Sequence, residues 1–142
     1  MFRQFFSRVS KPLVRYEMTS AGRERSLNRV QLLGRVAQDP IRAGSDEKPV
    51  VKLTVVTNRY YRTSDDSMQQ KADFHNISTF SPRLQDVVTN FVRKGTRVLV
   101  NGRLDYFKFE LEDGSVRKGT NIVMDELIIC AQPKDRGEQE EF

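Results

Sequence analysis

The sequence from Phe74 to Phe80 is Phe-His-Asn-Ile-Ser-Thr-Phe, and at a period of two its phenylalanines fall on one face and its isoleucine on the other. An alternation with a period of two is typical of a β-strand. The two faces of this predicted strand carry Phe74, Asn76, Ser78 and Phe80 on one side and His75, Ile77 and Thr79 on the other. If the first face is exposed, its two rings form a stacking platform for nucleobases. If that face points inward, the same rings belong to the core, and the pattern of this strand alone leaves both interpretations open.

Four further segments have the patterning of strands: residues 27–36, 50–61, 96–111 and 116–130. Glycines inside the first and third of these segments, Gly34 and Gly102, predict bulges or sharp bends. Turns are predicted at residues 44–47 and, around an Asp-Gly pair, at residues 112–115. The polar segment from Arg62 to Ala72 is predicted to be a flexible loop.

A single helix is predicted to follow the strand that ends at Phe80. Ser81 suits the N-cap and Pro82 the first helical position. Lys94 and Gly95 suit the last turn and the residue just beyond the helix. Between these signals lies an apolar stripe at helical spacing, formed by Leu84, Val87, Val88, Phe91 and Val92. We predict that the whole stripe, including its phenylalanine, packs in the core.

The predicted order is three strands, one helix and two strands, with glycine bends in two of the strands. This is the order of the OB-fold, a small barrel that binds oligonucleotides. We therefore predict an all-β protein: a five-stranded OB-fold Greek-key barrel with one helix between strands 3 and 4, formed by residues 25–131. A chain of 142 residues suits one such domain with short tails.

Residues 1–20 are predicted to be an organelle transit peptide and leader. The acidic residue nearest the N-terminus is Glu17, and apolar residues form a helical stripe opposite basic ones: Phe2, Phe5, Phe6, Val9 and Leu13. A basic, acid-free amphipathic N-terminus is typical of transit peptides. The alternative is a basic arm that lies on nucleic acid, but such an arm gains nothing from a stripe of phenylalanines.

Residues 132–142 are predicted to form a short acidic flexible tail, because they are too polar to pack. No apolar run approaches the ~20 residues that a membrane-spanning helix needs, so no membrane partner is expected. The formal net charge of +5 favours an anionic partner. Most of this excess lies before Ser26, so any affinity of the folded domain for an anion must come from where its cations are placed.

Patterns typical of catalysis and metal binding are absent from the sequence. The single cysteine, Cys130, excludes an internal disulfide and a cysteine-based zinc site. Its place at the end of an apolar run predicts a small core residue. The single histidine, His75, has no cysteine partner, and the chain lacks a paired-carboxylate motif, a phosphate-binding glycine loop and metal-ligand spacing. We predict a protein that is not an enzyme and needs no cofactor or metal.

Aromatic and basic residues instead lie together at residues 59–62 and at residues 106–109, with Arg117-Lys118 on the return strand, and Phe74 and Phe80 lie on the strand between these two places. Rings that stack on bases and cations that follow phosphates are the features of single-strand binding. Their joint placement predicts a protein that binds single-stranded DNA. An RNA-binding OB module, which would contact the 2′-hydroxyl, and an interaction scaffold for the replisome remain alternatives.

The sequence resembles the bacterial-type single-stranded DNA-binding protein family over about Arg25 to Ile129. The matching segments occur in the family's order, at residues 28–40, 56–58, 74–75 and 93–102. The resemblance implies an OB-fold homotetramer that wraps single-stranded DNA and supports organelle DNA replication. With its leader, the chain is similar to mitochondrial members of the family. This similarity implies a mitochondrial transit peptide, a place in the matrix nucleoid, and the mitochondrial replicative helicase and DNA polymerase as partners.

The resemblance also implies roles for individual residues. Tyr61, Phe74 and Phe109 stand where the family has stacking tryptophans, and His75 matches a histidine at a subunit interface. The chain departs from the family in having no tryptophan and in having Asn76 where the family motif has arginine. Together with the aromatic and basic pattern, the resemblance predicts a nucleic-acid-binding set: Arg29, Arg35, Arg59, Tyr61, Arg62, Phe74, Phe80, Arg83, Tyr106, Lys108, Phe109 and Arg117.

Overall fold

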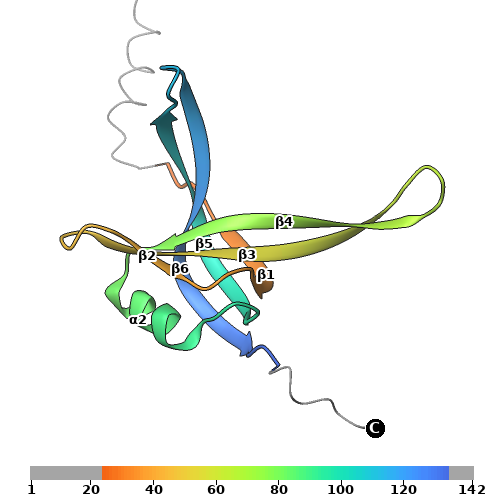
Figure 1. The fold of residues 1–142 in the computed structure, drawn as a ribbon, viewed down its shortest axis with the longest axis horizontal. Helices are drawn as coiled ribbons and strands as arrows, with labels where there is room; N and C mark the ends of the chain where they lie inside the picture. Colours follow the sequence, from red (N-terminus) through yellow and green to blue (C-terminus); the bar gives the residue numbers. More distant parts are fainter. Residues whose placement is uncertain (1–23, 135–142) are drawn as a thin grey trace, which may run out of the picture.

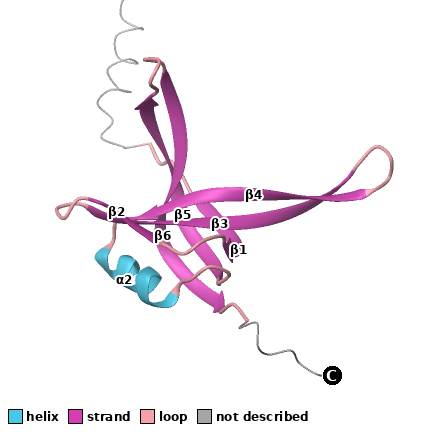
Figure 2. Cartoon of the chain, in the orientation of Figure 1, coloured by secondary structure: helices cyan, strands magenta, loops and turns pink. Residues whose placement is uncertain are grey.

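The computed structural model describes residues 24–134 of the chain (Figure 1). Strands dominate this part of the chain, and one helix accompanies them (Figure 2). The elements are β1 Val30–Val36, β2 Ile41–Gly44, β3 Pro49–Arg62, β4 Met68–Thr79, α2 Pro82–Phe91, β5 Arg97–Glu110 and β6 Val116–Ala131. The predicted transit peptide and the tail beyond Lys134 lie outside the described residues. Among residues 24–134, no helix has the length and apolar character needed to cross a membrane.

The strands form one sheet in the order β1-β5-β6-β4-β3-β2, and a second pairing between β1 and β3 closes it into a barrel. The closing pairs are Arg35 with Val56 and Val36 with Val55. The prediction of an OB-fold barrel with a helix after the third long strand is confirmed. One element was missed: β2 is a short strand of 4 residues that pairs with the start of β3. Its 4 residues are mostly exposed at the edge of the sheet, so they carry no apolar alternation.

The core is built from the inward-facing residues of the long strands. Val55 pairs with His75 and Leu53 with Ile77, and these pairs place the Ile77 face of β4 inward. Ile77 itself is only 1% exposed. The helix α2 packs against one end of the barrel (Figure 1) through Val88, and its buried Gln85 donates hydrogen bonds to two backbone carbonyls.

Both glycines that were predicted to mark bends lie where strands approach each other closely. A Cβ atom on Gly34 would lie 2.8 Å from Val55 Cγ1 and would also overlap the backbone of β3, so glycine permits β1 to cross β3. Gly102 lies at a register shift between β5 and β6, which is the predicted bulge. These two sites make it possible for one sheet to curve into a barrel.

The prediction of a flexible loop from Arg62 to Ala72 is wrong. β3 continues to Arg62 and β4 begins at Met68, so only residues 63–67 form the turn of a long hairpin that projects from the barrel (Figure 1). The hairpin is exposed on both faces away from the barrel. Polar residues therefore occupy both faces, and the alternation that identifies a half-buried strand is lost.

Two residues that were predicted to lie in the core are exposed. The ring of Phe91 is 60% exposed, because the helix turns the side of Gln85, Val88 and Val92 towards the barrel. Cys130 is also exposed. It alternates along β6 with Ile129, whose side chain packs against the core, so Cys130 points to the opposite face.

Candidate nucleic-acid interface

The rings of Phe74, on β4, and Phe80, directly after β4, are exposed rather than packed in the core. Phe74 is 65% exposed and Phe80 is 56% exposed. Asn76 lies between them on the same face and is also exposed. Since Ile77 occupies the core side, the alternative that placed the two rings in the core is wrong, and the exposed face is available as a stacking platform.

An open groove of about 540 Å³ extends from Phe80 across the barrel to Phe107 on β5. Its polar lining includes Asn76 on β4 and Asn121 on β6. The Asn121 side-chain amide donates a hydrogen bond of 3.0 Å to the Ser78 hydroxyl. The groove forms where β4 and β6 separate, because these two strands pair at only two positions. The result is a concave surface with rings from two different elements and amide groups between them.

The β5–β6 hairpin carries different residues on its two faces. The register pairs Phe107 with Gly119 and Phe109 with Arg117, so these side chains share one face. The centres of the Phe107 and Phe109 rings are 5.9 Å apart. The groove therefore continues from Phe107 along a pair of rings that ends beside an arginine.

Tyr106 and Lys108 belong to the opposite face of this hairpin. Their cross-strand partners are Thr120 and Lys118, respectively. The structure therefore separates these two predicted site residues from the Phe107–Phe109 pair. Phe107, which was not among the predicted site residues, is the one that lines the groove. Its alternation with Phe109 along the strand was a signal that could have identified it.

The β3–β4 hairpin likewise divides its aromatic residues between two faces. Tyr60 shares the face of Phe74, whereas Tyr61 lies on the other face and donates a hydrogen bond to Gln69. Tyr60 therefore adds a ring to the platform side. Like Phe107, it was not among the predicted site residues. Arg59 also lies on the other face, where its Nε is 3.4 Å from an oxygen of the Asp73 carboxylate. Its charge is already partly balanced within the protein.

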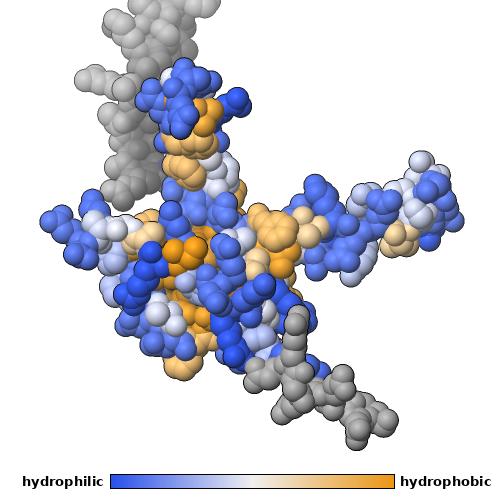
Figure 3. All heavy atoms as spheres, in the orientation of Figure 1, coloured by the Kyte–Doolittle hydropathy of each residue, from blue (hydrophilic) through white to orange (hydrophobic). Residues whose placement is uncertain are grey.

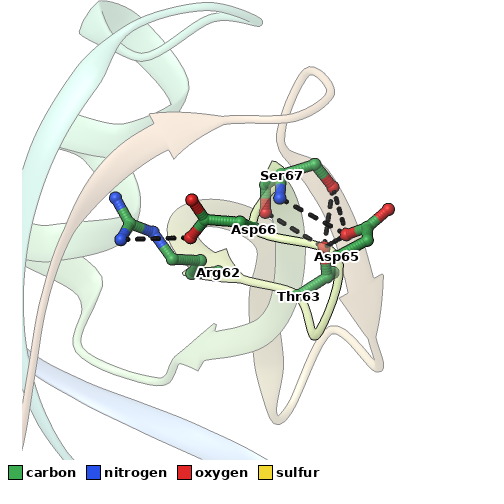
Figure 4. Close-up of polar contacts among 5 residues, drawn as sticks. All are labelled: Arg62, Thr63, Asp65, Asp66 and Ser67. Atoms are coloured by element: carbon green, nitrogen blue, oxygen red, sulfur yellow. Dashed lines mark hydrogen bonds and ion pairs between the residues drawn. The ribbon is translucent and has the colours of Figure 1, made fainter.

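The tip of this hairpin is ordered by its own polar contacts (Figure 4). Arg62 Nη1 lies 3.2 Å from an oxygen of Asp66, so this predicted phosphate contact shares its charge with a neighbouring carboxylate. The Thr63 hydroxyl donates to the Asp65 carboxylate, and the hydroxyl and backbone N–H of Ser67 do so as well. These hydrogen bonds, with that from Thr63 the largest cause, hold the pKa of Asp65 below its ordinary value.

The remaining predicted residues lie around these surfaces. Arg29 precedes β1 and Arg83 lies in the first turn of α2, three residues after Phe80, and both are exposed. His75 is half-buried on the face opposite to Phe74, and its Nε2 is 2.8 Å from the Thr57 hydroxyl. Its predicted role at a subunit interface stays a prediction.

Apolar side chains gather at the centre of the face seen in Figure 3, where the hairpins leave the barrel, and hydrophilic residues cover the outer part of the β3–β4 hairpin. Within the described part of the chain, no three His, Cys, Asp or Glu side chains are grouped so that they could hold a metal ion. The described surface can therefore bind a ligand by stacking on its rings, by hydrogen bonds from its amides and by ion pairs with its guanidinium groups.

A barrel of this topology with an aromatic groove and flanking cations defines a class of OB-fold proteins that bind single strands. The sequence model of the Single-strand binding protein family matches residues 27–130. The chain belongs to this family, which confirms the resemblance noted in the sequence.

Several relatives are similar over nearly the whole chain. The mitochondrial single-stranded DNA-binding protein of Oryctolagus cuniculus is 37% identical over 96% of this chain and 99% of its own. The protein of the same name from Rattus norvegicus is 39% identical over 92% of this chain and 93% of its own. Among solved structures, a Plasmodium falciparum SSB in complex with single-stranded DNA matches with a TM-score of 0.70 and 28% identity, over 77% of this chain and 99% of the other.

Proposed function

We propose that this protein binds single-stranded DNA with little dependence on sequence. The observation that carries the proposal is the groove between Phe80 and Phe107, with its continuation along Phe109 to Arg117. Every base has a ring face, so stacking on phenylalanine tolerates any sequence, and each stack contributes about 1–3 kcal/mol. Arginines beside the rings attract the phosphates that join the stacked nucleotides. The relatives that are named for this activity support the proposal.

The same relatives support a cellular role. Those from rabbit and rat are named as mitochondrial proteins, which supports a mitochondrial location for this protein. We propose that it acts in the matrix nucleoid. There it would protect single-stranded DNA during mitochondrial DNA replication, beside the replicative helicase and DNA polymerase. Residues 1–20 would supply the transit peptide, and their removal is expected to abolish import while leaving DNA affinity nearly unchanged.

We also propose that the protein acts as a homotetramer. Leu33, Leu99 and Ile128 lie in one cross-strand row on the outer face of β1, β5 and β6. Leu33 is 50% exposed and Ile128 is 46% exposed, so this row is an apolar surface open to a second copy. The next row is polar and ordered, because Gln31 donates to Asn101 (2.8 Å) and Asn101 donates to Glu126 (2.7 Å). An ordered polar border beside an apolar row is the usual composition of an interface.

The proposed function is tested by measuring the affinity of a labelled oligo-dT, with unlabelled RNA of matched length as competitor. Phe107→Ala should lower the affinity for DNA by about 1–3 kcal/mol, the value of one base stack. Phe91→Ala is the matched control, because it removes an exposed ring on α2 that does not line the groove. A loss that is equal in both variants, or preferential binding of the RNA, would overturn the proposal.

A further inference from the structure

A second hollow, of about 380 Å³, lies where β1, β3 and β5 meet. It shares no lining residue with the groove of Phe80 and Phe107. Its lining is largely polar and includes Arg35 from β1, Thr57 and Tyr60 from β3, and Arg97 from β5. Leu33, which belongs to the row proposed above as a contact between copies, lines one side of the hollow. Arg97 and Tyr60 were not among the residues that the sequence predicted, and we call this hollow the arginine pocket.

The two arginines of the pocket are direct cross-strand partners, since Arg35 pairs with Arg97. Like charges directly opposite each other destabilise a sheet unless an anion lies nearby. Among residues 24–134, neither guanidinium forms an ion pair with a carboxylate, whereas Arg59, Arg62 and Arg103 each pair with an aspartate. Arg35 Nη1 donates a 3.0 Å hydrogen bond to the backbone carbonyl of Gly95, which holds one guanidinium in place. The charge of the pocket is thus oriented and uncompensated by the described residues.

The pocket is continuous with the stacking face of β4. Four residues lie in one cross-strand row, in the order Arg97, Arg35, Val56 and Phe74. Arg35 is two strands away from Phe74, which corresponds to about 10 Å. Tyr60 lines the pocket and also lies on the Phe74 side of the β3–β4 hairpin. Two rings and two guanidiniums therefore occupy one surface, in the arrangement that bases and phosphates of one strand would require.

We propose that the arginine pocket is a phosphate site, in which Arg35 and Arg97 together hold a phosphodiester of single-stranded DNA whose neighbouring base stacks on Phe74 or Tyr60. A guanidinium presents a planar fork of donors that matches two phosphate oxygens. The site guides the strand from the platform of β4 across β3 towards β1. This inference rests on the proposed function, because it assigns a further contact to the same bound strand.

The test compares Arg97→Gln with Arg103→Gln, whose guanidinium pairs with Asp125 on another part of the barrel. Oligo-dT affinity is measured as a function of salt concentration. Because Arg35 still contacts the same phosphate, Arg97→Gln should lower the affinity and reduce the slope of log affinity against log salt by up to about 0.7, the value for one whole phosphate contact. Arg103→Gln should retain the wild-type slope. An unchanged slope in Arg97→Gln would overturn the inference and leave the proposed function intact, whereas a wild-type protein that does not bind oligo-dT would refute the proposed function itself.

Two further measurements separate the sources of the anion. The guanidinium NMR signals of Arg35 and Arg97 are followed during titration with oligo-dT and, separately, with inorganic phosphate at the same phosphate concentration. We expect saturable shifts with oligo-dT alone. Saturation by inorganic phosphate with an unchanged DNA slope in Arg97→Gln would identify a site for free phosphate compounds and overturn the DNA assignment. A fall in the mass of the Arg97→Gln assembly by light scattering, without a slope change, would identify a carboxylate of a second copy as the partner and also overturn it.

Discussion

The ring of Phe107 on β5 lies over Gly119, its cross-strand partner on β6. A Cβ atom on Gly119 would lie within 2.8 Å of three carbons of that ring, far closer than side chains can pack. The glycine therefore permits the ring to lie against the hairpin, where an aromatic side chain covers the exposed backbone of the glycine. This contact fixes the position of one wall of the groove.

Gly119→Ala is expected to displace the Phe107 ring and weaken binding of oligo-dT by up to about 1–3 kcal/mol, the value of one base stack. The midpoint of thermal unfolding should change little, because both residues lie outside the core. Val116→Ala serves as the control, since Val116 is exposed on the other face of the same hairpin. Wild-type affinity in Gly119→Ala would show that the ring position does not matter for binding.

The rings of β4 and the core residue between them should respond to truncation in opposite ways. Phe74→Ala and Phe80→Ala should each cost about 1–3 kcal/mol of binding free energy and little stability, because both rings are exposed. Ile77→Ala should instead lower the free energy of unfolding by about 2–5 kcal/mol through the cavity that it leaves. Thermal unfolding and oligo-dT affinity, measured on the same three variants, separate the two effects.

Phe74→Trp is the converse variant, and it should hold or improve affinity because a larger ring face is accommodated at an exposed site. If the thermal midpoint collapsed in Phe74→Ala while the folded fraction bound DNA normally, the platform would be refuted.

Local alternation predicted the two faces of β4 but not which face is inward. That choice is made by pairing with distant residues, since Leu53 and Val55 lie beside Ile77 and His75. The same limit applies to the β5–β6 hairpin, where the sequence predicts two faces but not which of them lines the groove. Whether Phe107 or its neighbour lines the groove depends on the register between β5 and β6, which a bulge shifts.

The arginine pocket was the least predictable feature of the site. Arg35 and Arg97 come from separate segments that become neighbours only when β1 and β5 pair. No local sequence pattern could therefore predict that they lie side by side. The helix illustrates a different limit. An apolar stripe at helical spacing includes residues at its edge, which need not face the core. Phe91 lies at the edge of the stripe on α2 and is exposed. The period of the apolar residues predicts which side of a helix is buried. How many residues of that side are buried depends on the part of the barrel that the helix packs against.

The salt dependence of binding should distinguish free arginines from paired ones. Arg117→Gln should reduce the slope of log affinity against log salt by about 0.7, the value for one phosphate contact with a single strand. Arg59→Gln should reduce it less, because Arg59 already pairs with Asp73. Anisotropy titrations with oligo-dT at several salt concentrations provide the slopes. Equal slopes in the wild type and in Arg117→Gln would exclude Arg117 as a phosphate contact.

The apolar row on the outer sheet face should control assembly. Ile128→Glu places a charge in the row formed with Leu33 and Leu99, so it should dissociate the tetramer at low protein concentration. The fold itself should survive, because Ile128 is exposed in the single chain. Light scattering measures the mass, and circular dichroism checks the fold.

His75→Tyr tests the other assembly prediction, since overfilling a close-packed contact should also favour dissociation. A wild-type mass in Ile128→Glu would exclude the apolar row as the interface. A wild-type mass in His75→Tyr on dilution would place the histidine away from any subunit contact.

The turn at the tip of the β3–β4 hairpin should weaken in acid. Hydrogen bonds from Thr63 and Ser67 favour the ionised form of Asp65, so its pKa in the folded protein lies below the ordinary value of 3.8. A group whose pKa is lowered by folding stabilises the folded state at pH values above its unfolded pKa. This contribution is lost as the pH falls through the lower, folded pKa. Carboxyl NMR titration of Asp65 measures the folded pKa directly.

Thr63→Val removes the largest cause of the shift, so it should raise the pKa of Asp65 towards 3.8. Asp113 provides an internal control, because Ser115 lowers its pKa in the same way at the tip of the other hairpin. Its titration should be identical in the wild type and in Thr63→Val. At neutral pH both carboxyls are ionised, so the loss of order at the tip should be confined to acid. An Asp65 that titrates at 3.8 in the wild-type protein would mean that the turn is not held by these hydrogen bonds in solution.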